Sequence, residues 1–489
     1  MRTGRHYIDS LNDGRRVFID GERVANVAAH PAFEGIARTV GSLYDYAADP
    51  ANGMIFHSPH TDGEANKVFM IPRSAAELQE RRQAIARWAN LTKGWVGRSP
   101  DHVGGFMAGF ASSPGTFDKP DREHGRNVTA FYQKLLEESL YVSYVIIPPQ
   151  IDRATTAHAW KEELLQVGVL EEREGGFVVR GSQMLGTSTS VSDYLFVSCI
   201  KPLAPADERY ALSFVLPVNT HGLKIYCRRP YAPGQPSQFD YPLSTRFDES
   251  DALIVFDDVF VPWENTFVYR DVEKLRNQFF DTAAHLLGNH QSQVRLIAKM
   301  KFIAGVARKI AQVNGIDVIP SVQEKLGEMA SLAAIVEGMV IAAEAACSID
   351  KHGVAKPNAR FMYGSMGLQA EIYPRAISIL RELAGGGVIQ LPSSYKELTN
   401  PETRPDFERY LQSPRAPYDE RIKLFKLAWD MIGSEFAGRH TQYEMFYAGA
   451  PFISRGYAYR NYGYDEAVGS VDEFLASYGL PGPAAKTDK

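Results

Sequence analysis

The stretch YPLSTRFDESDALIVFDDVFVPWEN (241–265) decides the fold class, because a polar, charged segment changes there into a long apolar run. Within it, ALIVFDDVFVP (252–262) is rich in β-branched and aromatic residues, which is typical of a strand. Similar short runs precede it, at 177–179, 194–200, 210–218 and 223–227. No segment between them is long and periodic enough for a crossover helix. The residues from about 155 to 270 therefore predict an antiparallel barrel or sandwich.

The chain before this region is predicted to be mainly helical. Ser74 and Glu77 have the spacing of a capping box, and apolar residues recur behind them at helical spacing. A second helix is predicted over 128–145. Pro148 and Pro149 would stop it, because proline lacks the backbone N–H that a continuing helix needs.

The chain after about residue 271 is predicted to be helical again, and four long amphipathic helices suggest a bundle. These four segments are 293–315, 321–353, 370–387 and 421–446. The predicted organisation is a helical domain over 1–147, a β-barrel domain over 148–270 and a helical-bundle domain over 271–489. Linkers rich in Gln, Ser or charge are absent, so we expect the three parts to pack as one unit.

Composition narrows the function classes. The 489 residues carry 53 Lys and Arg against 58 Asp and Glu, a formal net charge of −5, which does not favour a nucleic-acid or anionic-membrane partner. The three cysteines are widely spaced, which fits a reducing, cytoplasmic location. The chain shows no GxGxxG after a strand, no P-loop, no GxSxG and no HxxxH, HExxH or HxH pair. His57 and His60 are close in sequence, but their Gly/Asp/Pro-rich surroundings favour a solvated loop over a metal site. We therefore expect no metal, no bound nicotinamide nucleotide and no membrane span.

Several motifs, spread in order over nearly the whole chain, resemble one family. They are TGRHYIDSLNDGR (3–15), GRSPDH (97–102), PPQIDR (148–153), the 241–265 stretch, LPSS (391–394) and KLAWDMIGSEFAGRHTQYEMFYAG (426–449). The chain resembles the oxygenase component of 4-hydroxyphenylacetate 3-monooxygenase and its relatives, the two-component phenol hydroxylases that use reduced flavin. The resemblance implies an acyl-CoA dehydrogenase-like α+β fold, with an N-terminal α domain, a middle antiparallel β-barrel and a C-terminal four-helix bundle.

The resemblance also implies a reaction. A separate reductase supplies FADH2, O2 converts the bound flavin to a C4a-hydroperoxide, and the distal oxygen is transferred to the ring carbon ortho to a phenol hydroxyl. Such a cofactor carries the difficult chemistry, and the protein supplies placement and a dry site. An enzyme that receives its flavin already reduced needs no NAD fingerprint. The family resemblance further implies a homotetramer or a homodimer.

The implied phenol site contains two departures from the family pattern. Arg98 stands where the family has its phenol-binding arginine, and it would favour the phenolate by its charge. The family's tyrosine after GRSPD is His102 here, and the family's substrate histidine falls at Tyr144. We hypothesise that these two residues have exchanged positions, so that an imidazole and a hydroxyl still face the phenol oxygen. The alternative is a site that has changed its substrate, with His102 structural.

His290, near the catalytic histidine of chlorophenol-oxidising relatives, is a further candidate, although a helix cap or packing residue is the alternative.

The implied flavin and substrate contacts lie on four further segments. Gln150, Ile151, Asp152 and Arg153 would line the isoalloxazine edge, and Thr187 would lie near flavin N5. Ala450, Pro451, Phe452 and Ile453 correspond to a stretch that contacts FAD, but Phe452 and Ile453 replace polar and basic residues. Cys199 and Ile200 replace a Ser/Thr pair in the substrate-contacting loop, which argues against a carboxylate-tailed substrate such as 4-hydroxyphenylacetate.

Three alternatives remain at this point. The same transfer would expel a halogen or nitro group from a substituted phenol. A CoA-ester dehydrogenase or dehydratase would share the fold, although scattered cysteines do not fit an iron–sulfur site. A non-enzymatic scaffold would not need GRSPD and PPQIDR to occur together.

Overall fold

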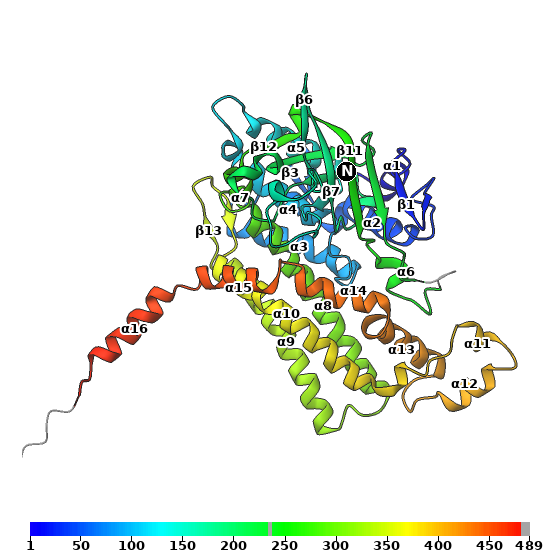
Figure 1. The fold of residues 1–489 in the computed structure, drawn as a ribbon. Helices are drawn as coiled ribbons and strands as arrows, with labels where there is room; N and C mark the ends of the chain where they lie inside the picture. The colour runs from blue at the N-terminus through cyan, green and yellow to red at the C-terminus, as the bar shows by residue number, and fades with distance from the viewer. Residues whose placement is uncertain (233–236, 481–489) are drawn as a thin grey trace, which may run out of the picture.

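The computed structural model describes residues 1–232 and 237–480, and it places a β-rich body above a group of long helices (Figure 1). Buried side chains from both regions join in one hydrophobic core. The helices of the first part are α1 (Gly4–Ser10), α2 (Glu34–Ala48), α3 (Ala75–Leu91), α4 (Pro100–Ala111) and α5 (His124–Glu138). The short strands among them are β1 (Val17–Ile19), β2 (Glu22–Arg23), β3 (Ile55–Ser58) and β4 (Gly63–Asn66).

The middle of the chain supplies most of the strands. They are β5 (Val142–Val145), β6 (Gly168–Arg173), β7 (Gly176–Gln183), β8 (Tyr194–Val197), β9 (Leu212–Pro217), β10 (Leu223–Cys227), β11 (Ala252–Pro262) and β12 (Thr266–Tyr269). Two short helices, α6 (Ser244–Phe247) and α7 (Val272–Asn277), flank β11 and β12. The 3-10 turns are η1 (Pro50–Asn52), η2 (Lys67–Phe69), η3 (Pro114–Phe117), η4 (Ala157–Ala159), η5 (Thr189–Val191), η6 (Pro205–Tyr210), η7 (Trp263–Asn265) and η8 (Gly385–Val388).

The strands form two larger sheets, in the orders β2-β1-β10-β11-β7-β6 and β12-β9-β8-β5. Pairing among β6 to β12 is antiparallel, as the sequence predicts. Each sheet also holds one parallel pair, β1 with β10 and β5 with β8. Both parallel pairs involve a strand from the first 147 residues, which the sequence analysis assigned to helices. The first part of the chain therefore completes the sheets as well as packing on them.

The predicted helix over 128–145 is wrong in its second half. Helix α5 ends at Glu138, and Ser139 adopts a left-handed conformation with φ of 49° that reverses the chain. The next residues form β5, in which Tyr144 pairs with Phe196 of β8. The pairing with β8, which local sequence does not show, overrides the apolar spacing that suggested a longer helix. Tyr144 therefore lies on a buried strand.

The last part of the chain contains the long helices. They are α8 (Ala284–Val313), α9 (Pro320–Ala345), α10 (Ala359–Ala384), α13 (Tyr418–Ile432) and α14 (Glu435–Phe446), with the shorter α11 (Lys396–Thr399), α12 (Arg404–Tyr410), α15 (Pro451–Asn461) and α16 (Tyr464–Ala476). The hairpin β13 (Ser348–Ile349) and β14 (Ala355–Lys356) follows α9, which ends earlier than predicted. The predicted fourth helix is two helices, because the chain breaks at Gly433 and Ser434 then caps α14.

Two features of this part are exposed. Helix α9 is the one described helix long and apolar enough to cross a membrane by length and composition, and it packs here against α8 and α10. Helix α16 leaves the body as an arm (Figure 1), and it has no buried residue.

Candidate functional site

The site is built around residues 97–99, at the end of the loop that joins α3 to α4. Gly97 is required there by close packing, because a Cβ at this position would collide with the rings of Tyr443 and Tyr447. The Tyr447 hydroxyl donates to the Gly97 carbonyl at 2.5 Å. The loop is thereby held against helix α14 and the residue that follows it.

The Glu249 carboxylate fixes the backbone of this loop. Its Oε1 accepts hydrogen bonds from the backbone N–H of Gly97 at 2.9 Å and of Arg98 at 2.6 Å. The Arg98 carbonyl in turn accepts from the Tyr141 hydroxyl at 2.6 Å. Glu249 is fully buried. A buried carboxylate needs such donors, and these bonds leave the Arg98 backbone little freedom.

The Arg98 side chain lies among aromatic rings. Its guanidinium carbon is 4.1 Å from the Tyr447 ring centroid, 5.7 Å from that of Tyr443 and 5.9 Å from that of Tyr144. One guanidinium nitrogen donates to the Tyr447 carbonyl at 3.1 Å, and another contacts His102 Nε2. Within the described residues, no carboxylate forms an ion pair with this guanidinium. The positive charge is therefore available to an anionic ligand.

His102, on α4, is neutral and has a defined tautomer. Burial, and then the nearby charge of Arg98, holds the pKa of His102 well below its usual range. Because Arg98 donates to Nε2, the single proton of the neutral ring is on Nδ1. Among the described residues, no group pairs with His102 Nδ1, which is buried. A buried N–H without a partner is costly, and it points to a ligand that accepts there.

Tyr144 approaches the same point from β5. Its ring lies 5.4 Å from the His102 ring in an edge-on arrangement and is stacked on Phe106 at 5.0 Å. Phe196 and Phe279 extend this aromatic wall. Tyr144 is half-buried, and burial raises the pKa of its hydroxyl well above its usual range. The structure thus brings Arg98, His102 and Tyr144 together.

Thr187 lies on a second loop, 185–190, whose backbone is strained at two positions. Leu185 and Ser188 have φ of 56° and 63°, values that non-glycine residues rarely adopt. The Thr187 hydroxyl is 2.8 Å from Asp251 Oδ1. Burial alone would raise the pKa of Asp251, but the charges of Arg439 and Arg228 hold that pKa well below its usual range. Asp251 is therefore ionised and can only accept, so the Thr187 hydroxyl donates to it and keeps its lone pairs for a ligand.

The loop 150–153 and residues 199–200 lie near each other beyond β5 and β8. Gln150, Ile151, Asp152 and Arg153 are surface residues that follow β5, and Lys201 donates from Nζ to the Thr155 carbonyl at 2.7 Å. The Ile200 N–H donates to the Ile146 carbonyl at 3.0 Å, while the Ile200 side chain is exposed. Burial raises the pKa of the Cys199 thiol to about 12, so it stays protonated.

The residues 450–453 begin helix α15, three positions after Tyr447. Ala450 is the N-cap residue, and Pro451, Phe452 and Ile453 form the first turn. Phe452 is 72% exposed, so its ring is not part of the core. The Tyr447 carbonyl that accepts from Arg98 places this turn next to the Arg98 loop.

The structure does not bring His290 to Arg98. His290 is fully buried on α8, with Nε2 2.7 Å from Glu344 Oε1 on α9 and Nδ1 3.3 Å from Arg81 on α3. The next residue, Gln291, points toward the site and lies 3.2 Å from Asp101 and 3.2 Å from the Tyr447 hydroxyl. Consecutive helical residues point about 100° apart, so one of the two faces the site. A catalytic role for His290 stays a prediction.

Sequence reasoning missed four residues that shape the site: Glu249, Arg439, Tyr447 and Gln291. The first three lie in the 241–265 and 426–449 stretches, which were quoted as family signatures without a role. Gln291 directly follows His290. Their contacts join segments about 150 or more residues apart, so no local pattern could show them.

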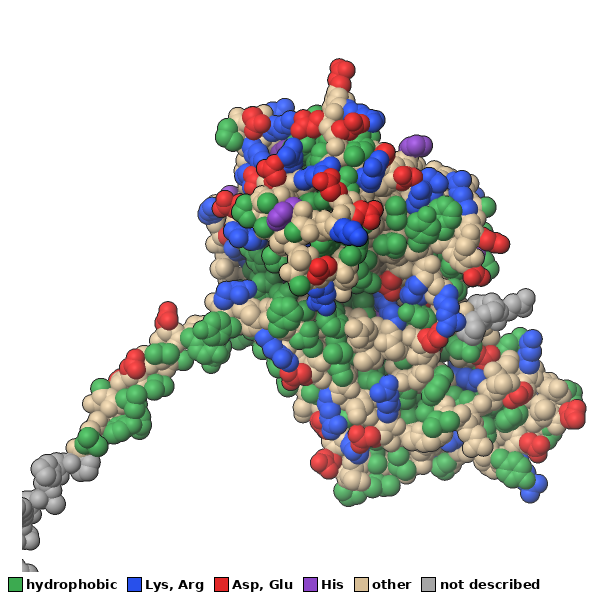
Figure 2. Space-filling model, in the orientation of Figure 1, with side chains coloured by type: hydrophobic (Ala, Val, Ile, Leu, Met, Phe, Trp, Pro, Cys, Tyr) green, Lys and Arg blue, Asp and Glu red, His purple; other side chains and the backbone are tan. Residues whose placement is uncertain are grey.

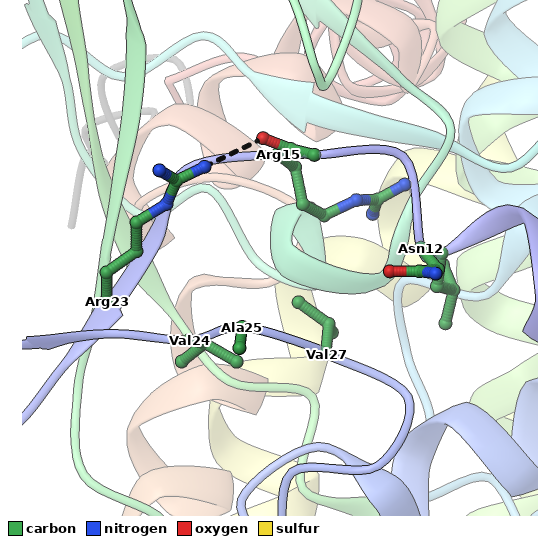
Figure 3. A pocket seen from close by; sticks show the side chains of 8 residues that line it. Asn12, Arg15, Arg23, Val24, Ala25 and Val27 are labelled. Carbon is green, nitrogen blue, oxygen red and sulfur yellow. Dashed lines mark hydrogen bonds between the residues drawn. The ribbon is translucent and has the colours of Figure 1, made fainter.

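One surface hollow lies elsewhere. It measures about 320 Å³ and is lined by residues near the N-terminus, among them Asn12, Arg15 and Arg23 (Figure 3). Arg23 is engaged with the Gly14 carbonyl at 3.2 Å, and Arg15 with Asp13. None of the residues lining this hollow belongs to the Arg98 cluster.

Comparison with known proteins shows which family the chain is similar to. Two family models match, described as 4-hydroxyphenylacetate 3-hydroxylase N terminal over residues 3–268 and C terminal over residues 275–476. The chain is 36% identical over 476 residues to the oxygenase component of 4-hydroxyphenylacetate 3-monooxygenase from Pseudomonas aeruginosa, covering 96% of this chain and 89% of that protein.

Two further similarities extend over almost the full length. The oxygenase component of a 4-nitrophenol 2-monooxygenase from Rhodococcus sp is 33% identical over 491 residues, with 98% of this chain and 93% of that protein covered. The crystal structure of the oxygenase component of 4-hydroxyphenylacetate 3-monooxygenase complexed with FAD and 4-hydroxyphenylacetate is similar, with a TM-score of 0.92. It is 33% identical and covers 98% of this chain and 99% of that chain.

Proposed function

The chain belongs to the 4-hydroxyphenylacetate 3-hydroxylase family, as the oxygenase component of a flavin monooxygenase that hydroxylates a phenol, and we propose that the phenol binds at Arg98. Its fold is acyl-CoA dehydrogenase-like, with mixed sheets against long helices. We also propose that the sheets close into a barrel and that the long helices form a four-helix bundle. The proposed domains span 1–147, 148–270 and 271–489.

The guanidinium of Arg98 carries the proposal, because among the described residues its partners are a carbonyl and an imidazole and not a carboxylate. A phenolate oxygen beside Arg98 would accept from the guanidinium, whose charge would lower the pKa of the phenol. The buried Nδ1–H of His102 points to the opposite side of the imidazole ring from Arg98, so it would donate to a second acceptor of the bound molecule. Phenolate formation makes the ortho carbon electron-rich, which transfer of an electrophilic oxygen requires. Tyr144 closes the other side of the phenol ring. The exchange of histidine and tyrosine between α4 and β5 then preserves activation of the phenol.

Thr187 and the segments beside it fit a reduced flavin. Because Asp251 takes the hydroxyl proton of Thr187, the Thr187 oxygen can accept from an N–H donor, and N5 of a reduced flavin carries such a hydrogen. We assign flavin contacts to Thr187, to residues 150–153 and to the turn 450–453. Reduced FAD, when bound, supplies the reaction with O2. The protein holds the two ring systems, and its aromatic wall excludes water from them.

The substrate proposed is a phenol without a carboxylate tail. Cys199 and Ile200 offer no hydroxyl group to such a tail, and the Cys199 thiol is protonated. The aromatic wall of Phe106, Phe196 and Phe279 suits an apolar substituent. A halogen or nitro group at the ortho carbon would leave in the same reaction.

One assay tests the proposed function. The chain is supplied with reduced FAD, O2 and a panel of phenols, with and without a carboxylate tail, and catechol and halide are measured. We expect catechol formation to be faster with uncharged phenols. Hydroxylation of 4-hydroxyphenylacetate at a higher kcat/KM than of any uncharged phenol would contradict the substrate assignment. Loss of activity in Arg98→Ala, with FAD still bound, would support the site.

We also propose that the chain assembles as a homotetramer or homodimer and receives FADH2 by diffusion from a separate reductase in the cytoplasm. Helix α16 supports assembly, because Val468, Val471, Phe474 and Leu475 give it an exposed apolar side (Figure 2). A helix of this length is marginal in water unless another surface covers it. The outer face of α9 is also uncharged, with Gly327, Ser331, Ala334, Ile335, Gly338, Ile341 and Ala345 exposed.

Light scattering tests the assembly. We expect a dimer or tetramer for the full chain, and a smaller species when Val468, Val471 and Phe474 are replaced by Asp. A monomeric full chain would contradict the proposal.

A further inference from the structure

Arg439, on α14, bridges the two acidic residues that hold the two loops of the site. Its Nε and Nη2 donate to the two oxygens of Asp251 at 3.0 and 2.8 Å, and its Nη1 donates to Glu249 Oε2 at 3.1 Å. The Arg439 side chain is only 8% exposed and lies over the Tyr443 ring at 3.9 Å. All three nitrogens of one planar group are therefore used in one buried arrangement.

Each carboxylate continues to a different half of the site. Glu249 Oε1 holds the backbone N–H of Arg98, as described above, and Asp251 Oδ1 receives the hydroxyl of Thr187. The Glu249 carbonyl also accepts from the Ser188 N–H at 2.9 Å, next to Thr187. The Arg98 loop and the Thr187 loop thus both bond to the 249–251 segment, and one guanidinium joins the two carboxylates of that segment.

We infer that Arg439 is a positioning residue that sets the distance between the bound phenol and the bound flavin, through Glu249 to Arg98 and through Asp251 to Thr187. The inference rests on the proposed function, which places the phenol at Arg98 and the flavin at Thr187. Oxygen transfer between two bound rings depends steeply on their alignment, because small displacements remove the reactive geometry. A guanidinium suits this role better than an ammonium, since its planar fork fixes the direction of every bond.

Other charges at this point do not replace Arg439. Arg228 shares Asp251 at 3.1 Å and pairs with Asp248, but its hydrogen bonds do not include Glu249. Removing Arg439 would therefore leave the Thr187 side partly held and would leave Glu249 Oε2 without its charged partner. A lysine in its place would keep the charge but not the planar fork, so it could not reproduce the paired bonds to Asp251 together with the bond to Glu249.

The experiment separates positioning from general stabilisation by measuring two constants. The KM for a phenol substrate is measured at saturating reduced FAD, and the Kd for FAD is measured by flavin fluorescence. We expect Glu249→Gln to raise the phenol KM by about 10-fold, equivalent to about 1.4 kcal/mol, and to leave the Kd for FAD within about 2-fold. We expect Asp251→Asn to show the reverse pattern.

Arg439→Lys is expected to raise both constants and to divert reduced flavin to hydrogen peroxide in place of hydroxylated product. Asp317→Asn serves as the matched control, because Asp317 pairs with Arg415 and Arg308 far along the chain and should change neither constant. Should Glu249→Gln fail to fold, Arg439→Lys and Asp251→Asn still give the test.

Either of two results would overturn the inference. In the first, Glu249→Gln and Asp251→Asn change the same constant, the phenol KM or the Kd for FAD, by the same factor. In the second, Arg439→Lys changes neither of these constants. Failure of the proposed function gives a different pattern. In that case Arg98→Ala leaves the phenol KM unchanged, or Thr187→Ala leaves the Kd for FAD unchanged, whatever the Arg439 variant does.

Discussion

The guanidinium of Arg98 and the imidazole of His102 are joined through Nε2, so the proton of the neutral ring is on Nδ1. The two residues are four positions apart, with Arg98 in the loop and His102 in the first turn of α4. Their contact holds the Arg98 charge close to Tyr144, while the Nδ1–H donor points to the other side of the imidazole ring. This pair determines the first two predictions.

Replacement of Arg98 should weaken phenol binding selectively. We expect Arg98→Ala to lower kcat/KM for the phenol by about 10- to 100-fold, because a hydrogen bond to a charged group contributes about 1.5–3 kcal/mol. Arg98→Lys keeps the charge and should lose less. Steady-state kinetics with a fixed supply of reduced FAD measure both variants. An equal loss in the two variants would mean that the charge alone does not explain the effect.

The exchange of histidine and tyrosine predicts that both side chains contribute. His102→Ala removes the Nε2 contact that orients the Arg98 guanidinium, together with the Nδ1 donor, and should lower kcat by about 10-fold or more, since a hydrogen bond to a charged group contributes about 1.5–3 kcal/mol. Tyr144→Phe removes only a hydroxyl and should have a smaller effect on kcat. Initial rates of catechol formation measure both. Unchanged kinetics in the two variants would contradict the exchange.

Sequence analysis could predict the middle strands and the long helices because their apolar periodicity is local. It could also name Arg98, His102 and Thr187 as candidates, because each lies within a short motif that resembles the family. The end of α5 and the strand position of Tyr144 could not be predicted, because pairing of β5 with β8 decides them. The bridge from Arg98 through Glu249 to Arg439 likewise depends on contacts between residues about 150 and 190 positions apart. Such a contact leaves no periodic signal in one sequence.

His290 should contribute to stability more than to phenol binding. Its ring joins Glu344 and Arg81 between three helices, and burial lowers its pKa. We therefore expect His290→Gln to lower the melting temperature while the KM for the phenol stays unchanged, because a lost buried hydrogen bond costs about 1–3 kcal/mol. Differential scanning fluorimetry and the phenol assay give the two readings. A large loss of kcat at an unchanged melting temperature would instead support a catalytic role.

Asp101 should make the stability of the fold depend on pH. It is buried at the start of α4, bonded to Ser99 and Gln291, and burial raises its pKa from 3.8 to about 6. A carboxyl whose pKa is higher in the folded than in the unfolded state binds its proton more tightly when folded. The stabilisation it gives is complete below about pH 4 and is lost as the pH rises through about 6.

The measurement compares the chain with Asp101→Asn, which keeps the shape and cannot ionise. Relative to this variant, the free energy of unfolding of the parent chain should fall by about 2 kcal/mol between pH 4 and pH 7, since each pKa unit corresponds to about 1.36 kcal/mol and part of the change lies below pH 4. Melting temperatures are measured for both proteins at several pH values. The difference in melting temperature between the parent chain and Asp101→Asn should narrow or reverse across this pH interval. Parallel pH profiles for the two proteins would show that Asp101 is not the group responsible, because only the parent chain can ionise at this position.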